Sequence, residues 1–131
     1  MRSLHLARLK FCALALGTIV VGLAVHWYGT IFSPALRDIF GDALWAMMIV
    51  WLIGALVPSR PIAVRAGLAL VICWMVEASQ AYHSQFLDSL RQTTIGALVL
   101  GTGFDLRDFA SYALGVATAA GLELVGRRSG R

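Results

Sequence analysis

Glu77 and Gln80 place a carboxylate and an amide near the end of an otherwise apolar run from Pro61 to Tyr82. A charge at the centre of a membrane helix costs about 2.5–3.5 kcal/mol on insertion scales, so a chain that keeps one there usually uses it. Residues three positions apart lie on the same face of a helix. The pair therefore predicts a polar helix face, whose carboxylate is suited to receive a hydroxyl, an ammonium group or a proton.

Further polar side chains lie at the ends of the neighbouring apolar runs or in the loop after Glu77. They are Asp42, His83, Asp88, Arg91, Asp105, Asp108 and Tyr112. Carboxyl groups paired in a partly dry site take different pKa values, which suits one of them to act as a general base. Arg91 is suited to bind anionic oxygens. The simpler interpretation is structural: the aspartates would cap helix starts, and Glu77 would pair with Arg91.

The elements that must position these side chains follow from the composition. The chain has 131 residues, of which 59% are hydrophobic and 14% are charged. A soluble domain carries roughly 25% charged residues, so this chain falls among membrane proteins. Apolar runs cover about 11–32, 42–57, 61–82 and 109–125, and a span needs about 20 apolar residues. We therefore predict an all-α integral membrane protein with four transmembrane helices in a single domain, 1–131. The first run is expected to stay as an anchor rather than to be cleaved as a signal peptide.

Two features bear on how these helices pack. The segment from Ile95 to Leu100 is apolar but too short to cross a bilayer, so it is either a re-entrant piece or an ordered surface loop. In the fourth helix, Gly115 and Ala119 form a pair of small residues that lets another helix approach closely. We expect this face to bring Asp108 toward the helix that carries Glu77.

Basic residues are distributed unevenly between the two sides of the predicted bundle. With four spans, the termini and the loop at 58–61 share one side. That side holds Arg2, Arg8, Lys10, Arg60, Arg65, Arg127, Arg128 and Arg131, whereas the other holds Arg37, Arg91 and Arg107. Cytoplasmic loops are enriched in Lys and Arg, so both termini are expected in the cytoplasm. The net charge of +4 is then a topology signal rather than a sign of nucleic-acid binding.

This topology brings the polar side chains to one depth on the outer side. Asp42 would open the second helix and Asp108 the fourth, while Glu77 and Gln80 would lie in the outer third of the third helix. Arg91 belongs to the following loop on the same side. We therefore expect an outward-facing polar pocket with Glu77 and Gln80 on one wall and Arg91 and Asp108 on the other.

Several of these residues occur in stretches that resemble a known family. The stretches are Gly41–Ala46, Glu77–His83 and Gly101–Asp108, with Arg91 between the last two and Asp108-x-x-x-Tyr112-x-x-Gly115 at the end. Their order and spacing resemble the VanZ-like family of small four-helix membrane proteins, and most closely its short, uncharacterised bacterial branch of domain-of-unknown-function proteins. The chain departs from the wider family at Ala46, Tyr112 and Ala119, where that family tends to have histidine, asparagine and glycine. The resemblance implies a bacterial inner-membrane protein with a role in the envelope, because the founding member is associated with resistance to a glycopeptide antibiotic.

The sequence favours a protein that binds or modulates an envelope lipid or polar headgroup through the pocket. The alternatives are an intramembrane acid/base enzyme acting on an envelope lipid and a structural subunit of a membrane complex. The sequence has no phosphate-binding loop, no zinc-binding helix and no serine-centred elbow. We therefore expect no cofactor and no metal. The expected partner is a membrane lipid and not a nucleic acid, and a homo-oligomer or a membrane-protein partner is compatible with the sequence.

Overall fold

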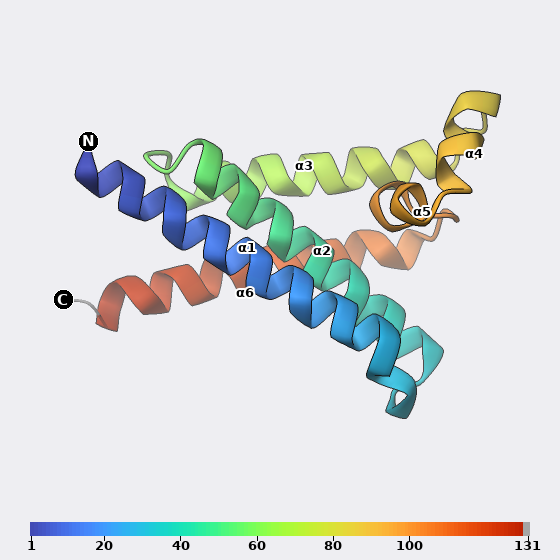
Figure 1. The fold of residues 1–131 in the computed structure, drawn as a ribbon, viewed down its shortest axis with the longest axis horizontal. Coiled ribbons are helices and arrows are strands. Elements are labelled where there is room, and N and C mark those ends of the chain that lie inside the picture. The colour runs from blue at the N-terminus through green and yellow to red at the C-terminus, as the bar shows by residue number, and fades with distance from the viewer. Residues whose placement is uncertain (130–131) are drawn as a thin grey trace.

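The computed structural model describes residues 1–129, which form helices joined by short connections (Figure 1). The four long helices are α1 (Arg2–Tyr28), α2 (Pro34–Leu56), α3 (Ile62–Gln80) and α6 (Leu106–Ser129). All four are long and apolar enough to cross a membrane. The prediction of an all-α protein with four membrane-spanning helices is thus confirmed.

The connections contain three shorter elements, the 3-10 turn η1 (Gly29–Ile31) and the helices α4 (Gln85–Arg91) and α5 (Thr94–Leu100). Ser84 and Thr93 begin the two short helices, because their hydroxyl oxygens accept hydrogen bonds from Leu87 N and Gly96 N. The apolar segment at 95–100 therefore forms a helix of about two turns rather than an irregular loop.

The start of α2 differs from the sequence prediction, which placed Asp42 at the beginning of the second helix. The helix begins at Pro34, because Ser33 Oγ accepts a hydrogen bond from Leu36 N and proline is tolerated in the first turn. Asp42 therefore lies about 12 Å along the helix axis from the helix start. A cap of α2 is excluded as its role, and its carboxyl group faces other helices instead.

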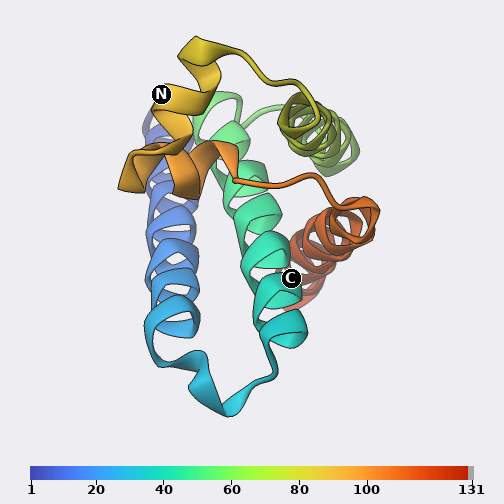
Figure 2. The ribbon, with the colours of Figure 1, turned by 90° about the vertical axis from the view of Figure 1, so that its right-hand side faces the viewer.

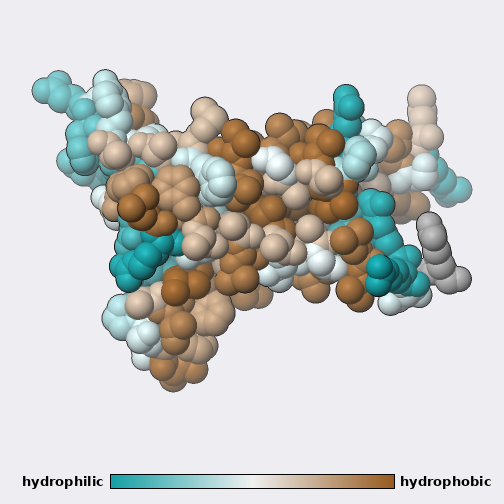
Figure 3. Space-filling model, turned by 180° about the vertical axis from the view of Figure 1, so that it is seen from behind, coloured by the Kyte–Doolittle hydropathy of each residue, from teal (hydrophilic) through white to brown (hydrophobic). Residues whose placement is uncertain are grey.

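The long helices cross in two layers (Figure 1). The α1–α2 hairpin crosses α3 and α6, and α2 packs on each of the other three long helices. The N-terminus, the α2–α3 turn and the end of α6 lie together, and we call this the terminal end. The opposite end, which carries η1, α4 and α5, is the loop end. From behind, mostly apolar residues cover the surface between hydrophilic residues at the two ends (Figure 3).

A close helix crossing fixes α6 against α2. Gly115 lies directly on the backbone carbonyl of Ala43, where any Cβ atom would collide with that oxygen. Ala119 is fully buried one turn further on. The small-residue face predicted for α6 therefore exists, but it packs on α2, whereas the sequence analysis directed it toward α3.

Candidate functional site

Glu77 is fully buried between α3 and α6 and accepts three hydrogen bonds. Its Oε1 accepts from Asp105 N at 2.8 Å, and its Oε2 accepts from Tyr112 Oη at 3.0 Å and from Gln80 Nε2 at 3.2 Å. Among residues 1–129 it has no ion-pair partner. All three neighbours donate, which suits an ionised carboxylate. The carboxylate also lies beside the N-terminus of α6, where a helix stabilises negative charge.

The loop at 101–105 is folded around this carboxylate. Gly101 has φ +69° and lies against the Gln80 side chain, so a Cβ atom at this position would collide with the Gln80 amide. The loop ends at Asp105, whose backbone N–H reaches Glu77 and whose Oδ1 accepts from Arg107 N at 2.9 Å. Asp105 therefore caps α6, as the structural interpretation of the sequence expected. Glu77 and Gln80 therefore fix the position of the loop that leads into α6.

Asp42 and Asp108 form a second acidic group that differs from Glu77 in its partners. Their carboxyl groups lie next to each other where α2 packs on α6. Glu77 and Asp38 lie near enough to both to repel their negative charge. The structure therefore brings Asp42 from α2 together with Asp108 from α6, as the sequence predicted, although Asp42 reaches the site from within its helix.

A cleft of about 1090 Å³ opens onto this pair at the loop end. Its walls come from α1, α2, α5, the 101–105 loop and the first turns of α6, with Val76 and Gln80 from α3. Its polar lining consists of Thr18, His26, Arg37, Asp38, Asp42, Gln80, Thr102, Asp105, Arg107, Asp108 and Tyr112. Glu77 does not line the cleft but lies behind Gln80 and Tyr112. Viewed from the loop end, α5 lies across the bundle on the side of α1 (Figure 2).

The rim of the cleft carries one exposed ion pair. Arg107 Nη2 lies 2.7 Å from Asp105 Oδ2, and the hydrogen bonds from Arg107 hold the pKa of the Asp105 carboxyl below its usual value. The cleft lining contains four aspartates, Asp38, Asp42, Asp105 and Asp108, against two arginines, Arg37 and Arg107, of which Arg107 is paired with Asp105. The inner part of the cleft is therefore rich in hydrogen-bond acceptors.

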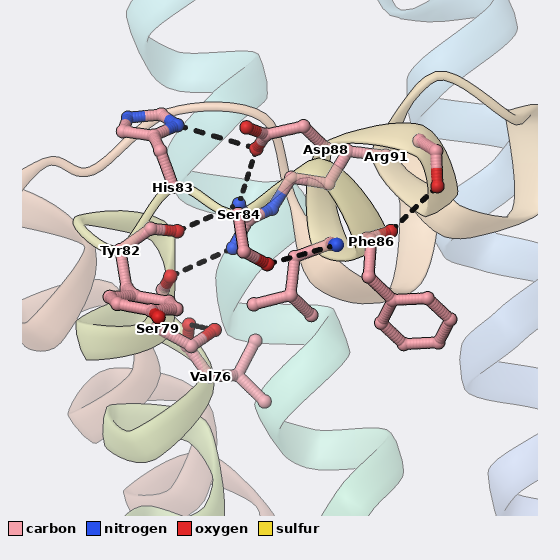
Figure 4. A network of polar contacts seen from close by, with 10 residues as sticks. Val76, Ser79, Tyr82, His83, Ser84, Phe86, Asp88 and Arg91 are labelled. Atoms are coloured by element: carbon pink, nitrogen blue, oxygen red, sulfur yellow. Dashed lines mark hydrogen bonds and ion pairs between the residues drawn. The ribbon is translucent and has the colours of Figure 1, made fainter.

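Arg91 does not form the opposite wall that the sequence analysis assigned to it. Its Nη2 donates to Ser79 O at 2.8 Å, and its Nη1 donates to Tyr82 O and to Asp88 Oδ1, both at 3.1 Å (Figure 4). It is absent from the lining of the cleft. The last carbonyl groups of a helix lack partners within the helix, and Arg91 supplies donors to this region at the end of α3.

His83 and Asp88 belong to this same network and not to the cleft. His83 Nδ1 lies 3.3 Å from Asp88 Oδ1, and the His83 side chain is 72% exposed (Figure 4). The expected pair between Glu77 and Arg91 is not formed in the part of the chain that the structure describes. Three of the nine residues predicted for the site thus stabilise the α3–α4 connection instead.

A second buried polar cluster lies at the terminal end, and most of its contacts were not predicted from the sequence. Arg65 is completely buried in α3 and its Nη2 lies 2.6 Å from Glu123 Oε1 of α6. The guanidinium carbon lies 4.7 Å from the centre of the Phe11 ring of α1. Gly54 of α2 leaves the space, because a Cβ atom there would be 2.9 Å from Arg65 Nη1. All four long helices therefore meet at one guanidinium.

The sequence contained a signal for this cluster. Arg65 stands four residues into the third apolar run. A charge that only sets the topology would be expected before the helix and not inside it. Arg127 stands four residues after Glu123 on α6, and Arg127 Nη2 lies 2.7 Å from Glu123 Oε1. From the sequence, Arg65 was predicted only to mark the topology, and Asp38 was not predicted to line the cleft.

The acidic side chains do not build a metal centre. Within residues 1–129, no group of three or more His, Cys, Asp or Glu side chains is arranged to hold a metal ion. The arrangement of Asp42 and Asp108 suits hydrogen bonding and attraction of positive charge.

Comparison with known proteins places this site within a family. Residues 31–116 match the family described as "Protein of unknown function (DUF2809)". The match runs from the end of η1 to the middle of α6, so it includes Asp42, Glu77, Asp108 and Tyr112 and leaves out α1. No solved structure matches the chain. Because the match covers well over half of its length, the chain belongs to the DUF2809 family of proteins of unknown function.

Proposed function

We propose that this protein binds the polar head group of an envelope lipid in the cleft, through hydroxyl or ammonium groups that donate to Asp42 and Asp108. The observation that carries the proposal is the facing pair of carboxyl groups on the wall of a cleft of about 1090 Å³, within a bundle of membrane-spanning helices. Both carboxyl groups are half-buried, and hydrogen bonds to charged groups are stronger than neutral ones, so a ligand that supplies donors is stabilised there.

The partners of the acidic residues separate structure from binding. Glu77 already accepts three hydrogen bonds. The side chains of Asp42 and Asp108 lie next to each other and accept no hydrogen bond from another residue in the described part of the chain. Arg91, which was expected to meet anionic oxygens, is occupied at the end of α3. These contacts favour recognition of a donor-bearing head group over recognition of a phosphate.

The rest of the cleft suits an amphiphile. Apolar side chains of α1, α2 and α5 make up much of its lining, and they include Ile19, Leu23, Leu44, Met48 and Leu98. A water-soluble ligand would leave these side chains without a partner, whereas a lipid places its own apolar part against them. The combination of acceptors and apolar walls therefore supports a lipid.

The expected location supports an envelope ligand. We place the protein in a bacterial inner membrane with both termini in the cytoplasm, because basic residues gather at the terminal end. The cleft then opens on the outer side. The resemblance to VanZ-like proteins, which implies an envelope role, agrees with this placement.

Lipid analysis of the purified protein tests the proposal. The protein is extracted in polymer nanodiscs that retain native lipid, and the bound lipid classes are measured by mass spectrometry. We expect enrichment of a class with hydroxyl or ammonium groups in its head. The double variant Asp42→Asn and Asp108→Asn should lower this enrichment by about ten-fold or more, because hydrogen bonds to charged groups contribute about 1.5–3 kcal/mol each.

The control is Asp88→Asn, which removes a carboxylate of α4 that pairs with Arg91 and His83 outside the cleft. This variant should keep the lipid profile of the unaltered protein. Identical profiles in all three proteins would refute the proposal.

A second candidate is acid/base catalysis on an envelope lipid, and the proximity of the Asp42 and Asp108 carboxyl groups is the observation that favours it. Two carboxyl groups that share a proton provide one acid and one base in the same site. Incubation of the purified protein with an envelope lipid extract, followed by mass spectrometry, separates the two candidates. Appearance of a product that Asp108→Asn abolishes would favour catalysis, and an unchanged extract would favour binding alone.

A further inference from the structure

We infer that the gap between α1 and α5 is a binding groove for an alkyl chain of a membrane lipid whose head group occupies the cleft. This inference rests on the proposed function and adds the part of the ligand that the groove would hold.

The groove is a cavity of about 300 Å³ lined by residues of α1, α5 and the following loop. These residues are Leu23, His26, Trp27, Thr94, Ala97, Leu98 and Thr102. Five of them, Leu23, His26, Ala97, Leu98 and Thr102, also line the large cleft. The two hollows are therefore neighbours across the same side chains, and one molecule can occupy both.

The helices on either side of the groove are packed elsewhere. In the described chain, α1 packs extensively on α2 alone among the long helices, while α5 packs on α4 and α3. No residue of α5 is buried, and Leu98 is 50% exposed. An apolar side chain that faces a hollow in a membrane protein needs an apolar neighbour, and a lipid chain supplies one.

The direction of the groove matches an amphiphile. The acceptors Asp42 and Asp108 lie on α2 and α6, whereas the apolar Leu23 and Leu98 lie on α1 and α5. A lipid with its head at the carboxyl pair would direct a chain between α1 and α5 into the bilayer. Trp27, which is 63% exposed, lies at this opening, and tryptophan is enriched at the membrane interface.

Photolabelling of the whole protein in vesicles tests the inference. The vesicles contain phosphatidylethanolamine and phosphatidylglycerol with a trace of a photoreactive lipid that carries a diazirine midway along one acyl chain. Two probes are used, one with a phosphatidylethanolamine head and one with the hydroxyl head of diacylglycerol. We expect labelling at Leu23 and Leu98 to exceed labelling at Leu16 and Leu122, which are 63% and 57% exposed on other surfaces.

Matched variants of α5 separate the groove from general lipid contact. Leu98→Trp fills the groove and should reduce labelling at Leu23 to the level of Leu16. Ile95→Trp places the same ring on α5 at a residue that is 75% exposed and lines neither cavity, and it should leave labelling unchanged. Equal labelling of Leu16, Leu23, Leu98 and Leu122 with both probes would overturn the inference.

The double variant Asp42→Asn and Asp108→Asn distinguishes failure of the groove from failure of the proposed function. If the double variant loses groove labelling and also changes the lipid profile, the result supports both the groove and head-group binding in the cleft. Uniform labelling with a lipid profile that still depends on Asp42 and Asp108 overturns the groove alone. Groove labelling that survives the double variant, with an unchanged lipid profile, overturns head-group binding and with it the combined site.

Discussion

Glu77 and the Asp42–Asp108 pair lie in one acidic region, yet their surroundings give them different tasks. Glu77 is enclosed by donors from α3, the 101–105 loop and α6, so it fixes the geometry of the site. Asp42 and Asp108 lie next to each other on the cleft wall, and within residues 1–129 no donor from another residue reaches their side chains. The hydrogen-bond partners of a polar residue in a membrane helix thus indicate its role better than the cost of burying it does.

Replacement of Glu77 should destabilise the protein more than loss of any one of its donors. Glu77→Gln turns an amide donor toward groups that are themselves donors, and we expect a loss of about 1.5–3 kcal/mol in the free energy of unfolding. Tyr112→Phe removes one hydrogen bond and should cost about 1 kcal/mol. Reversible unfolding in mixed micelles, followed by tryptophan fluorescence, measures both. A Glu77→Gln protein as stable as the unaltered one would show that the three hydrogen bonds do not require a carboxylate at this position.

Arg65 and Arg127 bind the same oxygen of Glu123 and form a natural comparison. Arg65 is fully buried, so Arg65→Ala leaves a buried carboxylate with one partner fewer, and we expect a loss of about 3 kcal/mol or more in the free energy of unfolding. Arg127 has a side chain that is 57% exposed, and Arg127→Ala should cost about 0–1 kcal/mol. Equal losses in the same unfolding measurement would contradict the assignment of Arg65 as the central link.

At the scale of the elements, the α2–α6 crossing positions both halves of the carboxyl pair. Asp42 and Ala43 are adjacent on α2, and Gly115 of α6 lies on the Ala43 carbonyl. The separation of the two helices at this crossing therefore sets the distance between Asp42 and Asp108. Any residue that pushes α6 away from α2 should separate the two carboxyl groups.

Two glycines of α6 test this crossing. Gly115→Ala should cost about 1–3 kcal/mol, because its methyl group collides with a backbone oxygen that cannot move freely. Gly121→Ala is the matched control, since nothing lies within 4 Å of the position that its methyl group would take. It should be neutral or stabilising by up to about 1 kcal/mol through helix propensity. A Gly115→Ala protein that is as stable as Gly121→Ala would refute the close crossing.

The four long helices could be predicted because length and apolar composition are local properties of the chain. The start of α2 could not be placed correctly, since Ser33-Pro34 both ends one segment and caps the next. The site was predicted in part. Asp42, Glu77 and Asp108 share a depth that follows from topology, whereas the rotation of each helix does not. Arg91 was misplaced because the carbonyl groups at the end of α3 compete for the same guanidinium.

At the scale of the whole molecule, the structure places the N-terminus and the end of α6 together, and the basic residues predict which side of the membrane that end occupies. We expect a C-terminal green fluorescent protein fusion to be fluorescent and a C-terminal alkaline phosphatase fusion to be inactive, because both report a cytoplasmic terminus. Fusions after Gly103, at the loop end, should show the reverse. Active phosphatase at the C-terminus would contradict the proposed orientation and would turn the cleft toward the cytoplasm.

The separation of charge between the two ends makes the molecule an electrical dipole along the bundle axis. Six of the seven acidic residues, Asp38, Asp42, Glu77, Asp88, Asp105 and Asp108, belong to the loop end. Moving one charge through a potential of 100 mV is worth about 2.3 kcal/mol. In an energised membrane whose cytoplasmic side is negative, the voltage therefore favours the same orientation of the bundle as the basic residues of the terminal end. The membrane voltage would oppose inverted insertion of the bundle and would draw a cationic head group from the outer surface into the cleft.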